Sequence, residues 1–254
     1  MRSTKQVRLT IDGELCYLYV TDDCETANKL KKQGEKVLIS LHDGNRNEDF
    51  SGFAYCTEAE EPDPGYLEQV YRRLAGLPWT ICETERCIVR ESVSEDAEAF
   101  FSIYKEDSVR RFVREQYDTI PETRKALQDY IDHHYRFFEF GLWTVLDKAT
   151  GEIIGRAGFS VKEEADYPDL GYLITEKRQG EGIATEVCKA LVRYADTELE
   201  FEKMLIFAEK ENPASVKVAE KLGFVHGGQA VIDGIACEKF EYDNKELKKW
   251  VRQL

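Results

Sequence analysis

The chain has 254 residues, of which 42% are hydrophobic, and its net charge is -14 at pH 7. This length exceeds one average domain, and the acidic balance excludes a general nucleic-acid binder. The sequence has neither an apolar run long enough to span a bilayer nor a signal peptide, so no membrane partner and a cytoplasmic location are expected.

The N-terminal part, residues 1–78, is predicted to form a small α/β domain. Its pattern predicts the order strand–helix–strand–strand–helix, over residues 15–20, 25–32, 37–41, 53–56 and 66–74. This order favours a small unit with parallel strands. The domain boundary is expected within residues 77–80, so that a second domain covers residues 79–254.

The layout of residues 1–78 faintly resembles the later half of a HAD-like hydrolase core, which makes a degenerate HAD-like unit one interpretation. The nucleophilic Asp-x-Asp of such phosphatases does not follow a strand here, so no phosphatase activity is expected. Asp22 and Asp23 are interpreted as the cap of the following helix rather than a metal site. A ligand-binding or partner-binding module is the alternative.

The middle of the chain is predicted to alternate strands and helices. Strands are expected at residues 84–91, 142–146 and 153–159, and helices at residues 95–106 and 121–138. His133 and His134 are adjacent on the second helix and therefore face different directions. No catalytic role is favoured for either of them.

A loop that contains two glycines, residues 175–186, joins an apolar strand at residues 170–174 to a helix. Free N–H groups in the first turn of a helix bind anions, and the helix dipole favours negative charge there. Gly180 and Gly182 remove the side chains that would keep a pyrophosphate from the backbone. The loop lacks the Lys-Ser/Thr ending of a P-loop and the spacing of a dinucleotide fingerprint.

A second motif follows downstream of this loop. A strand at residues 204–208 leads into Asn212-Pro213-Ala214-Ser215, a helix and Leu222-Gly223-Phe224. Asn212 is suited to cap the helix, proline suits the first helical turn, and Gly223 is suited to end the helix.

Gln179-x-x-Gly182-x-Ala184 resembles the phosphate-binding signature of the GNAT acetyltransferases, and the motif after residue 211 resembles their second motif. The strands at 84–91 and 142–159 are similar to those of the RimJ/RimL subgroup, which acetylates N-terminal amines of ribosomal proteins. The likeness covers about residues 84–243. It implies a GNAT fold with a mixed, mostly antiparallel central sheet for residues 79–254. The chain as a whole is then α/β, with an α+β acetyltransferase part.

The resemblance implies an N-acetyltransferase that moves an acetyl group from acetyl-CoA, its cosubstrate, to a primary amine by direct attack in a ternary complex. The acceptor is a protein N-terminus or a small-molecule amine, and a homodimer is considered. No metal is expected, because the seven cysteines are scattered without ligand spacing. The residues implied in binding the cosubstrate are Tyr172, Leu173, Ile174, Arg178, Gln179, Gly180, Glu181, Gly182, Ile183, Ala184, Thr185 and Asn212.

Two side chains are candidates for catalysis by the same resemblance. Asp169 lies where many relatives carry a Glu, and it is the candidate base, directly or through water. Its alternative role is to attract the cationic amine. Ser215 is the candidate donor to the departing thiolate, and its alternative role is a second helix cap.

The sequence also departs from the family pattern. Many members carry a Tyr on the helix after Asn-x-x-Ser, where this chain has Val218 and Ala219, and a carboxylate where it has Phe207. The missing Tyr keeps open a CoA-binding regulatory module without turnover, and the missing carboxylate leaves the assignment of a peptide amine open. The helix–loop–helix at 95–138 is expected to cover the acceptor groove, and the aromatic residues considered for its lining are Phe112, Tyr117 and Tyr135.

Overall fold

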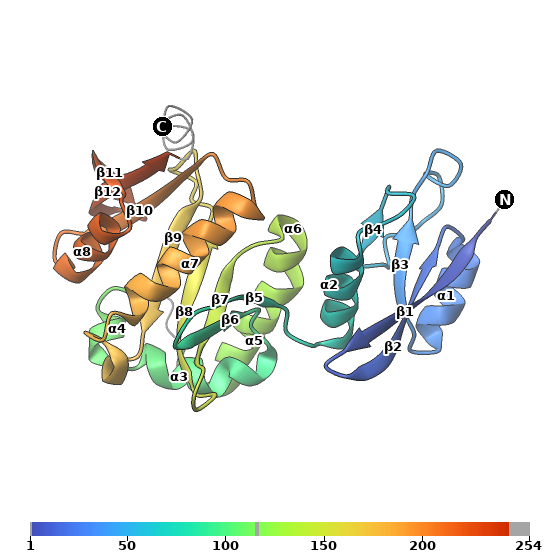
Figure 1. Cartoon of the computed structure of the whole chain (residues 1–254), viewed down its shortest axis with the longest axis horizontal. Helices are drawn as coiled ribbons and strands as arrows, with labels where there is room; N and C mark the ends of the chain where they lie inside the picture. Colours follow the sequence, from blue (N-terminus) through green and yellow to red (C-terminus); the bar gives the residue numbers. More distant parts are fainter. Residues whose placement is uncertain (1, 115–116, 244–254) are drawn as a thin grey trace. The chain divides into compact units, whose positions relative to one another are not determined.

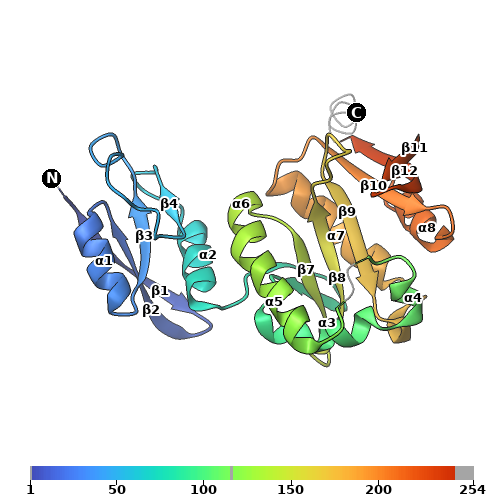
Figure 2. The ribbon, with the colours of Figure 1, turned by 180° about the vertical axis from the view of Figure 1, so that it is seen from behind.

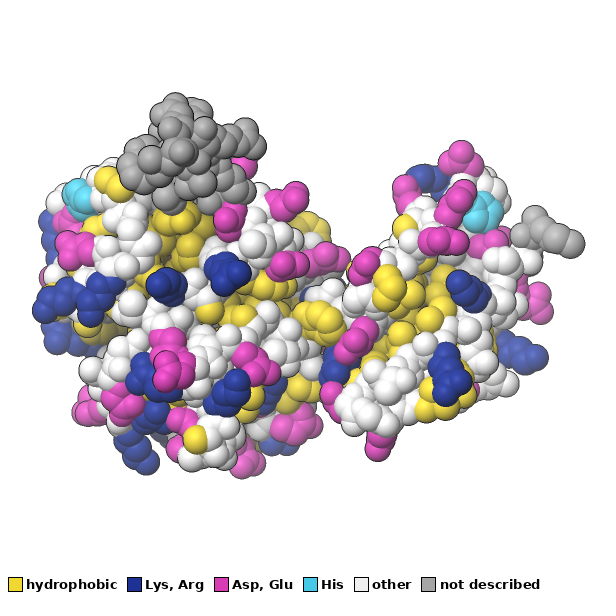
Figure 3. All heavy atoms as spheres, in the orientation of Figure 1, with side chains coloured by type: hydrophobic (Ala, Val, Ile, Leu, Met, Phe, Trp, Pro, Cys, Tyr) yellow, Lys and Arg dark blue, Asp and Glu magenta, His cyan; other side chains and the backbone are white. Residues whose placement is uncertain are grey.

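The computed structural model describes residues 2–114 and 117–243. They belong to two compact units, Met1–Trp79 and Thr80–Leu254, which are drawn in Figure 1. Within the described part of the chain, no helix is long and apolar enough to cross a membrane. Figure 3 shows acidic and basic side chains interspersed over one face of each unit, with hydrophobic side chains between them.

The smaller unit is built on a mixed four-stranded sheet in the order β1-β2-β3-β4. Strands β1 and β2 are antiparallel, whereas β2–β3 and β3–β4 are parallel. The elements are β1 (Thr4–Ile11), β2 (Glu14–Thr21), α1 (Cys24–Lys32), β3 (Lys36–Ser40), β4 (Cys56–Thr57) and α2 (Pro64–Ala75). The prediction of a purely parallel unit is therefore wrong, because β1 was missed.

Alternation along β3 gives this unit two apolar layers. Val37 and Ile39 pack with Ala27 of α1, whereas Leu38 packs with Val70 of α2. A strand that is apolar on both faces is recognisable in sequence, and β3 was found. Strand β1 is largely exposed and polar, which explains why no such signal marks it. The predicted third strand at 53–56 is also displaced, because β4 begins only at Cys56.

The larger unit contains an eight-stranded sheet in the order β11-β12-β10-β9-β8-β7-β6-β5. Every neighbouring pair is antiparallel except β9–β10, which is parallel. The predicted mixed, mostly antiparallel sheet is confirmed. The strands are β5 (Thr80–Glu83), β6 (Cys87–Arg90), β7 (Leu142–Asp147), β8 (Ile153–Ser160), β9 (Asp169–Ile174), β10 (Lys203–Glu209), β11 (Val225–Ile232) and β12 (Ile235–Asp243). Residues of the predicted 79–254 domain beyond Asp243 lie outside the described residues.

Helices cover both faces of this sheet. On one face, α3 and α5 pack through a cluster that includes Phe100 and Leu127 and that contacts Leu173 of β9; Figure 2 shows this side. On the other face, α7 crosses the strands in Figure 1 and places Tyr194 against Trp143 of β7, 5.8 Å between ring centroids. The α-helices are α3 (Ala97–Tyr104), α4 (Asp107–Arg110), α5 (Ile120–Tyr130), α6 (Arg136–Phe138), α7 (Ile183–Thr197) and α8 (Pro213–Lys221).

Two predicted elements of this unit differ from the structure. The strand expected at 84–91 begins only at Cys87, because Thr84 and Cys87 close the turn of the β5–β6 hairpin through a 2.8 Å backbone hydrogen bond. The helix expected at 121–138 is interrupted by a π-helical turn, Ile131–Tyr135. Predicted helix caps agree better, since the Asn212 side chain accepts the backbone N–H of Ser215 and caps α8.

Strands β9 and β10 meet at one end and then diverge. Within the described residues their ladder has one register pair, Leu205 with Asp169, extended by a hydrogen bond from the Leu205 N–H to the Pro168 carbonyl. Beyond that pair, β9 from Gly171 to Ile174 runs without a ladder to β10. This gap lies next to the glycine loop that follows β9, and the candidate active site is located there.

Candidate active site

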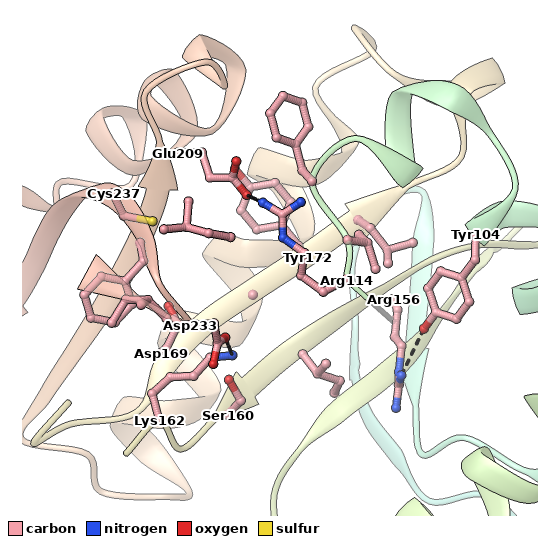
Figure 4. Close-up of a pocket in the computed structure, with 18 residues that line it drawn as sticks. Tyr104, Arg114, Arg156, Ser160, Lys162, Asp169, Tyr172, Glu209, Asp233 and Cys237 are labelled. Carbon is pink, nitrogen blue, oxygen red and sulfur yellow. Dashed lines mark hydrogen bonds and ion pairs between the residues drawn. The ribbon is translucent and has the colours of Figure 1, made fainter. Parts of the chain in front are cut away.

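A cavity of about 390 Å³ opens where β9 and β10 diverge, and Figure 4 shows its side chains. Strands β8, β9, β10 and β12 and the segment after α4 all contribute to its wall. The lining residues are Tyr104, Phe112, Val113, Arg114, Leu142, Arg156, Ser160, Lys162, Asp169, Gly171, Tyr172, Leu173, Phe207, Glu209, Ile232, Asp233, Ile235 and Cys237. The lining therefore combines apolar side chains with six charged ones, so a bound ligand can meet both kinds of group.

Asp169 lies at the apex of the gap, where β9 and β10 still pair. Asp169 is only 9% exposed. Burial raises the pKa of Asp169 to about 6, although Lys162 and the Phe207 N–H act in the opposite direction. A carboxyl group with a pKa near neutrality, facing a cavity, can exchange protons with a bound ligand.

The raised pKa of Asp169 predicts a stability effect. Because the folded-state pKa, about 6, lies above the ordinary value of 3.8, ionisation destabilises the fold as the pH rises through 6. Asp169→Asn removes this loss, so the variant should gain up to roughly 3 kcal/mol over wild type between pH 4 and pH 8. Urea unfolding at both pH values measures the gain. The exposed neighbour Asp166, changed to Asn, is the control, and an equal gain in both variants would contradict the assignment.

Other charged groups of the cavity wall are held in pairs. Arg114 contacts Glu209 at 2.6 Å, and Lys162 contacts Asp233 at 3.7 Å. The Arg156 guanidinium donates to the Tyr104 hydroxyl at 3.0 Å. Glu209 was missed from the sequence, although it lies two residues after Phe207 and so shares its face of β10. Strand β10 therefore does place a carboxylate in the cavity wall, at Glu209 rather than at Phe207.

Tyr172 of β9 and Ser215 of α8 meet across the gap. The Tyr172 hydroxyl donates a hydrogen bond to Ser215 Oγ, with 3.1 Å between the oxygens. The backbone N–H of Ser215 is bound by the Asn212 side chain. Ser215 therefore does not cap α8 itself, and its hydroxyl is directed at β9.

The loop after β9 leads into the N-terminus of α7. Gly180 and Gly182 have φ values of 79° and 81°, which only glycine adopts without strain. Gly182 is the N-cap, and no side chain within the described ranges caps α7 there. The first N–H groups of this helix are therefore available to an anion.

Ion pairs hold this loop in place. Arg178 contacts Asp147 of β7 at 2.5 Å and Glu181 at 3.0 Å. The Arg178 hydrogen bond is the largest of the effects that lower the pKa of Asp147 to about 2. Arg86, for which no sequence motif predicts a role, donates to the Glu181 carbonyl and contacts Glu186 at 2.7 Å. Both arginines thus connect the loop to neighbouring strands.

The loop is also joined to the segment that lines the cavity. The Glu106 carboxylate accepts hydrogen bonds from the Thr175 hydroxyl and the Glu176 N–H, both at 2.6 Å. Gln179 donates to the Ile174 carbonyl at 2.8 Å and to the Ser108 hydroxyl at 3.2 Å. The segment that starts at Glu106 therefore contacts the glycine loop through Glu106 and Ser108. Farther along, the same segment lines the cavity through Phe112, Val113 and Arg114.

The aromatic and histidine predictions have mixed outcomes. Phe112 lines the main cavity, and Tyr117 lines a smaller one beside α5. Tyr135 belongs to the core instead, since it is 1% exposed and its hydroxyl donates to the Leu142 carbonyl. His133 is exposed at the surface, and His134 stacks on Tyr130. Neither histidine is among the described residues that line the two cavities.

Comparison with known proteins places this site in a family context. The profile of the acetyltransferase (GNAT) domain family matches residues 86–225. The chain is 36% identical over 84 residues to the uncharacterised protein YkkB of Bacillus subtilis (strain 168). These aligned residues make up 32% of this chain and 49% of YkkB. The chain therefore spans about half the length of that relative.

Two further matches extend over most of the length of the related protein. The [ribosomal protein uS5]-alanine N-acetyltransferase of Escherichia coli (strain K12) is 29% identical over 175 residues, or 63% of this chain and 88% of that enzyme. The crystal structure of an acetyltransferase from Agrobacterium tumefaciens str. C58 superposes with a TM-score of 0.56 at 25% identity. That superposition covers 64% of this chain and 94% of the other.

Proposed function

Since the chain belongs to the GNAT acetyltransferase family and is an acyltransferase, we propose that it transfers an acetyl group from acetyl-CoA to a primary amine. The transfer occurs by direct attack within a ternary complex. The observation that carries the proposal is the buried carboxyl group of Asp169 at the apex of the β9–β10 gap. The gap is the proposed site for the donor, the glycine loop for the phosphates of the donor, and the cavity for the acceptor.

The donor site fits the chemistry of acetyl-CoA. A pyrophosphate needs several N–H donors and close backbone approach, and the uncapped start of α7 with Gly180 and Gly182 supports both. The pantetheine arm carries amide groups, and the open edge of β9 offers backbone partners for them. We assign donor binding to the strand and loop residues Tyr172, Leu173, Ile174, Arg178, Gln179, Gly180, Glu181, Gly182, Ile183, Ala184 and Thr185, with Asn212 holding the start of α8.

Each step of the transfer has a candidate group. The amine must be neutral to attack, and Asp169 accepts its proton directly or through water. A backbone N–H of β9 near Gly171 stabilises the developing oxyanion. Ser215 donates to the sulphur as it leaves. No metal is needed in this scheme, and the described residues contain no cluster of metal-ligating side chains.

We propose a peptide N-terminus as the acceptor, ahead of a small-molecule amine. The Escherichia coli relative is named as an alanine N-acetyltransferase that acts on a ribosomal protein. Of the six charged side chains in the cavity wall, four form ion pairs with each other, Arg114 with Glu209 and Lys162 with Asp233. Such a wall suits a small apolar first residue better than a polycation, which would require unpaired carboxylates.

The test is release of CoA thiol from acetyl-CoA in the presence of a panel of amines. Peptides that begin with Ala or Ser should release thiol faster than spermidine, free amino acids or an aminoglycoside. Faster turnover of one of the small amines would replace the peptide assignment. Acetyl-CoA binding without thiol release for any amine would instead support a regulatory CoA-binding module, which the absence of a tyrosine at Val218 and Ala219 favours.

We propose that residues 79–254 carry the reaction and that residues 1–78 serve stability or self-association. A shortened chain beginning at Pro78 retains β5 and the whole glycine loop. It should therefore show the same rise in melting temperature with acetyl-CoA as the full chain, because ligand binding stabilises the folded state by mass action.

Calorimetry of both chains measures this rise, and residues 1–78 alone are the control, which should show none. A shortened chain that is folded by circular dichroism but unresponsive to acetyl-CoA would show that the N-terminal unit contributes to the donor site.

A further inference from the structure

The hydrogen bond between Tyr172 and Ser215 joins two elements that otherwise separate at the gap. Tyr172 belongs to β9 and Ser215 to the first turn of α8, and their oxygens lie 3.1 Å apart. Helix α8 carries Val218 and Ala219 in its next turn, so the helix itself brings no phenol to this point. A tyrosine hydroxyl nevertheless reaches the helix, from the opposite side of the gap.

We propose that Tyr172 is a positioning residue that aims the Ser215 hydroxyl at the sulphur of the bound thioester, an inference that rests on the proposed function. Tyr172 donates to Ser215 Oγ, which leaves the hydrogen of Ser215 itself free to point elsewhere. Without a partner, a serine hydroxyl in the first helical turn rotates among several staggered orientations. The bond from Tyr172 opposes that rotation.

The chemistry supported by this pair is the departure of the thiolate. The amine nitrogen bonds to the thioester carbon, the carbon–sulphur bond breaks, and its electron pair goes to sulphur. The amine proton passes to Asp169 and then to water, and the thiolate later takes a proton from water, so the proton count closes. Ser215 contributes a hydrogen bond to the sulphur while negative charge develops there.

The surroundings of the pair favour this arrangement. Burial raises the pKa of Tyr172 far above its usual value, so the phenol remains a donor at any working pH. The backbone N–H of Ser215 is already bound to the Asn212 side chain at 3.1 Å, which fixes the start of the helix. A hydroxyl that accepts one hydrogen bond also donates a stronger one, because linked hydrogen bonds polarise each other.

The first experiment is a double-mutant cycle on thiol release with Tyr172→Phe, Ser215→Ala and the combination. Ser215→Ala should lower kcat by roughly ten- to a thousandfold with little change in the KM for acetyl-CoA. Tyr172→Phe should lower kcat by about tenfold, and the double variant should match Ser215→Ala within about twofold, because Tyr172 acts through Ser215. Independent losses that multiply, or an unchanged kcat in Tyr172→Phe, would overturn the proposal.

The second experiment needs no turnover. CoA and desulpho-CoA differ only at the sulphur, so the ratio of their dissociation constants reports on contacts at that atom. The measurement is made at pH 9, where part of the thiol is ionised. Wild type should prefer CoA by at least about fivefold, the size expected for one hydrogen bond to a charged group. Tyr172→Phe and Ser215→Ala should each abolish the preference.

Tyr242→Phe removes a phenol from β12 that does not line the cavity and is the matched control. It should keep both the kcat and the preference for CoA. A preference for CoA in the absence of any thiol release would mean that the positioning role holds while the proposed function fails. Equal binding of the two ligands by wild type, or binding of neither, would overturn the positioning role.

Discussion

Asp169→Asn should reduce kcat/KM by about a hundredfold, the scale of losing a general base. The carboxylate must be ionised to take the amine proton, and its pKa is raised to about 6. In wild type, kcat/KM should therefore rise as the pH increases through 6, and the variant should lack this rise. A further rise near the pKa of the acceptor amine should remain, because it belongs to the substrate.

The pH–rate profile of Asp169→Asn at two salt concentrations separates a base from an electrostatic guide. If Asp169 only attracts a cationic amine, the substitution should raise the acceptor KM, weaken the salt dependence and leave the pH profile unchanged. Asp166→Asn, in the exposed segment before β9, is the control and should match wild type. A variant at Asp169 that matches wild type in every respect would remove it from the mechanism and favour ordered water.

Gly182→Val should abolish the rise in melting temperature that acetyl-CoA produces. At a hundred times its dissociation constant, the ligand stabilises the fold by about 2.7 kcal/mol, or on the order of 5–10 °C here. Gly182 has a φ of 81° at the N-cap of α7, a conformation that a β-branched residue strongly disfavours. Its side chain would also stand where the first N–H groups of the helix must meet the phosphates.

Backbone strain alone is a competing explanation, and Gly223→Val controls for it. Gly223 follows α8 with a φ of 83°, and a Cβ there would meet nothing within 4 Å. Both variants should lose stability, but Gly223→Val should retain the response to acetyl-CoA. A normal response in Gly182→Val would mean that the pyrophosphate binds elsewhere.

The fold of the larger unit was predictable where elements are buried or capped by local sequence. Strand β8 is buried over most of its length and is marked by Ile153, Ile154, Ala157 and Phe159. The Asn212 and Gly223 signals mark the two ends of α8. Edge strands such as β1 and β5 could not be predicted from the sequence, because an exposed edge strand has no continuous apolar run. The split of the 121–138 helix by a π-helical turn likewise depends on tertiary packing rather than on propensity.

The candidate site was predictable as far as its motifs are contiguous in sequence. The glycine loop and Asn212-x-x-Ser215 were recognised, since each one lies on a single segment. The pair Tyr172–Ser215, the Arg86 contact with the loop and the Glu209 carboxylate were missed. Each of them depends on which segments the sheet order brings together, and spacing along the chain contains no such information.

A single register pair, Leu205 with Asp169, joins β9 to β10 within the described part of the sheet. The sheet therefore consists of two parts, β5 to β9 on one side of this junction and β10, β12 and β11 on the other. Each side has its own continuous antiparallel ladder. A seam of this kind allows the two sides to open as separate cooperative units, at a free energy below that of global unfolding. On the proposed binding mode, the amide groups of acetyl-CoA pair with the open edge of β9, so the ligand should slow amide hydrogen exchange across the seam more than in either ladder.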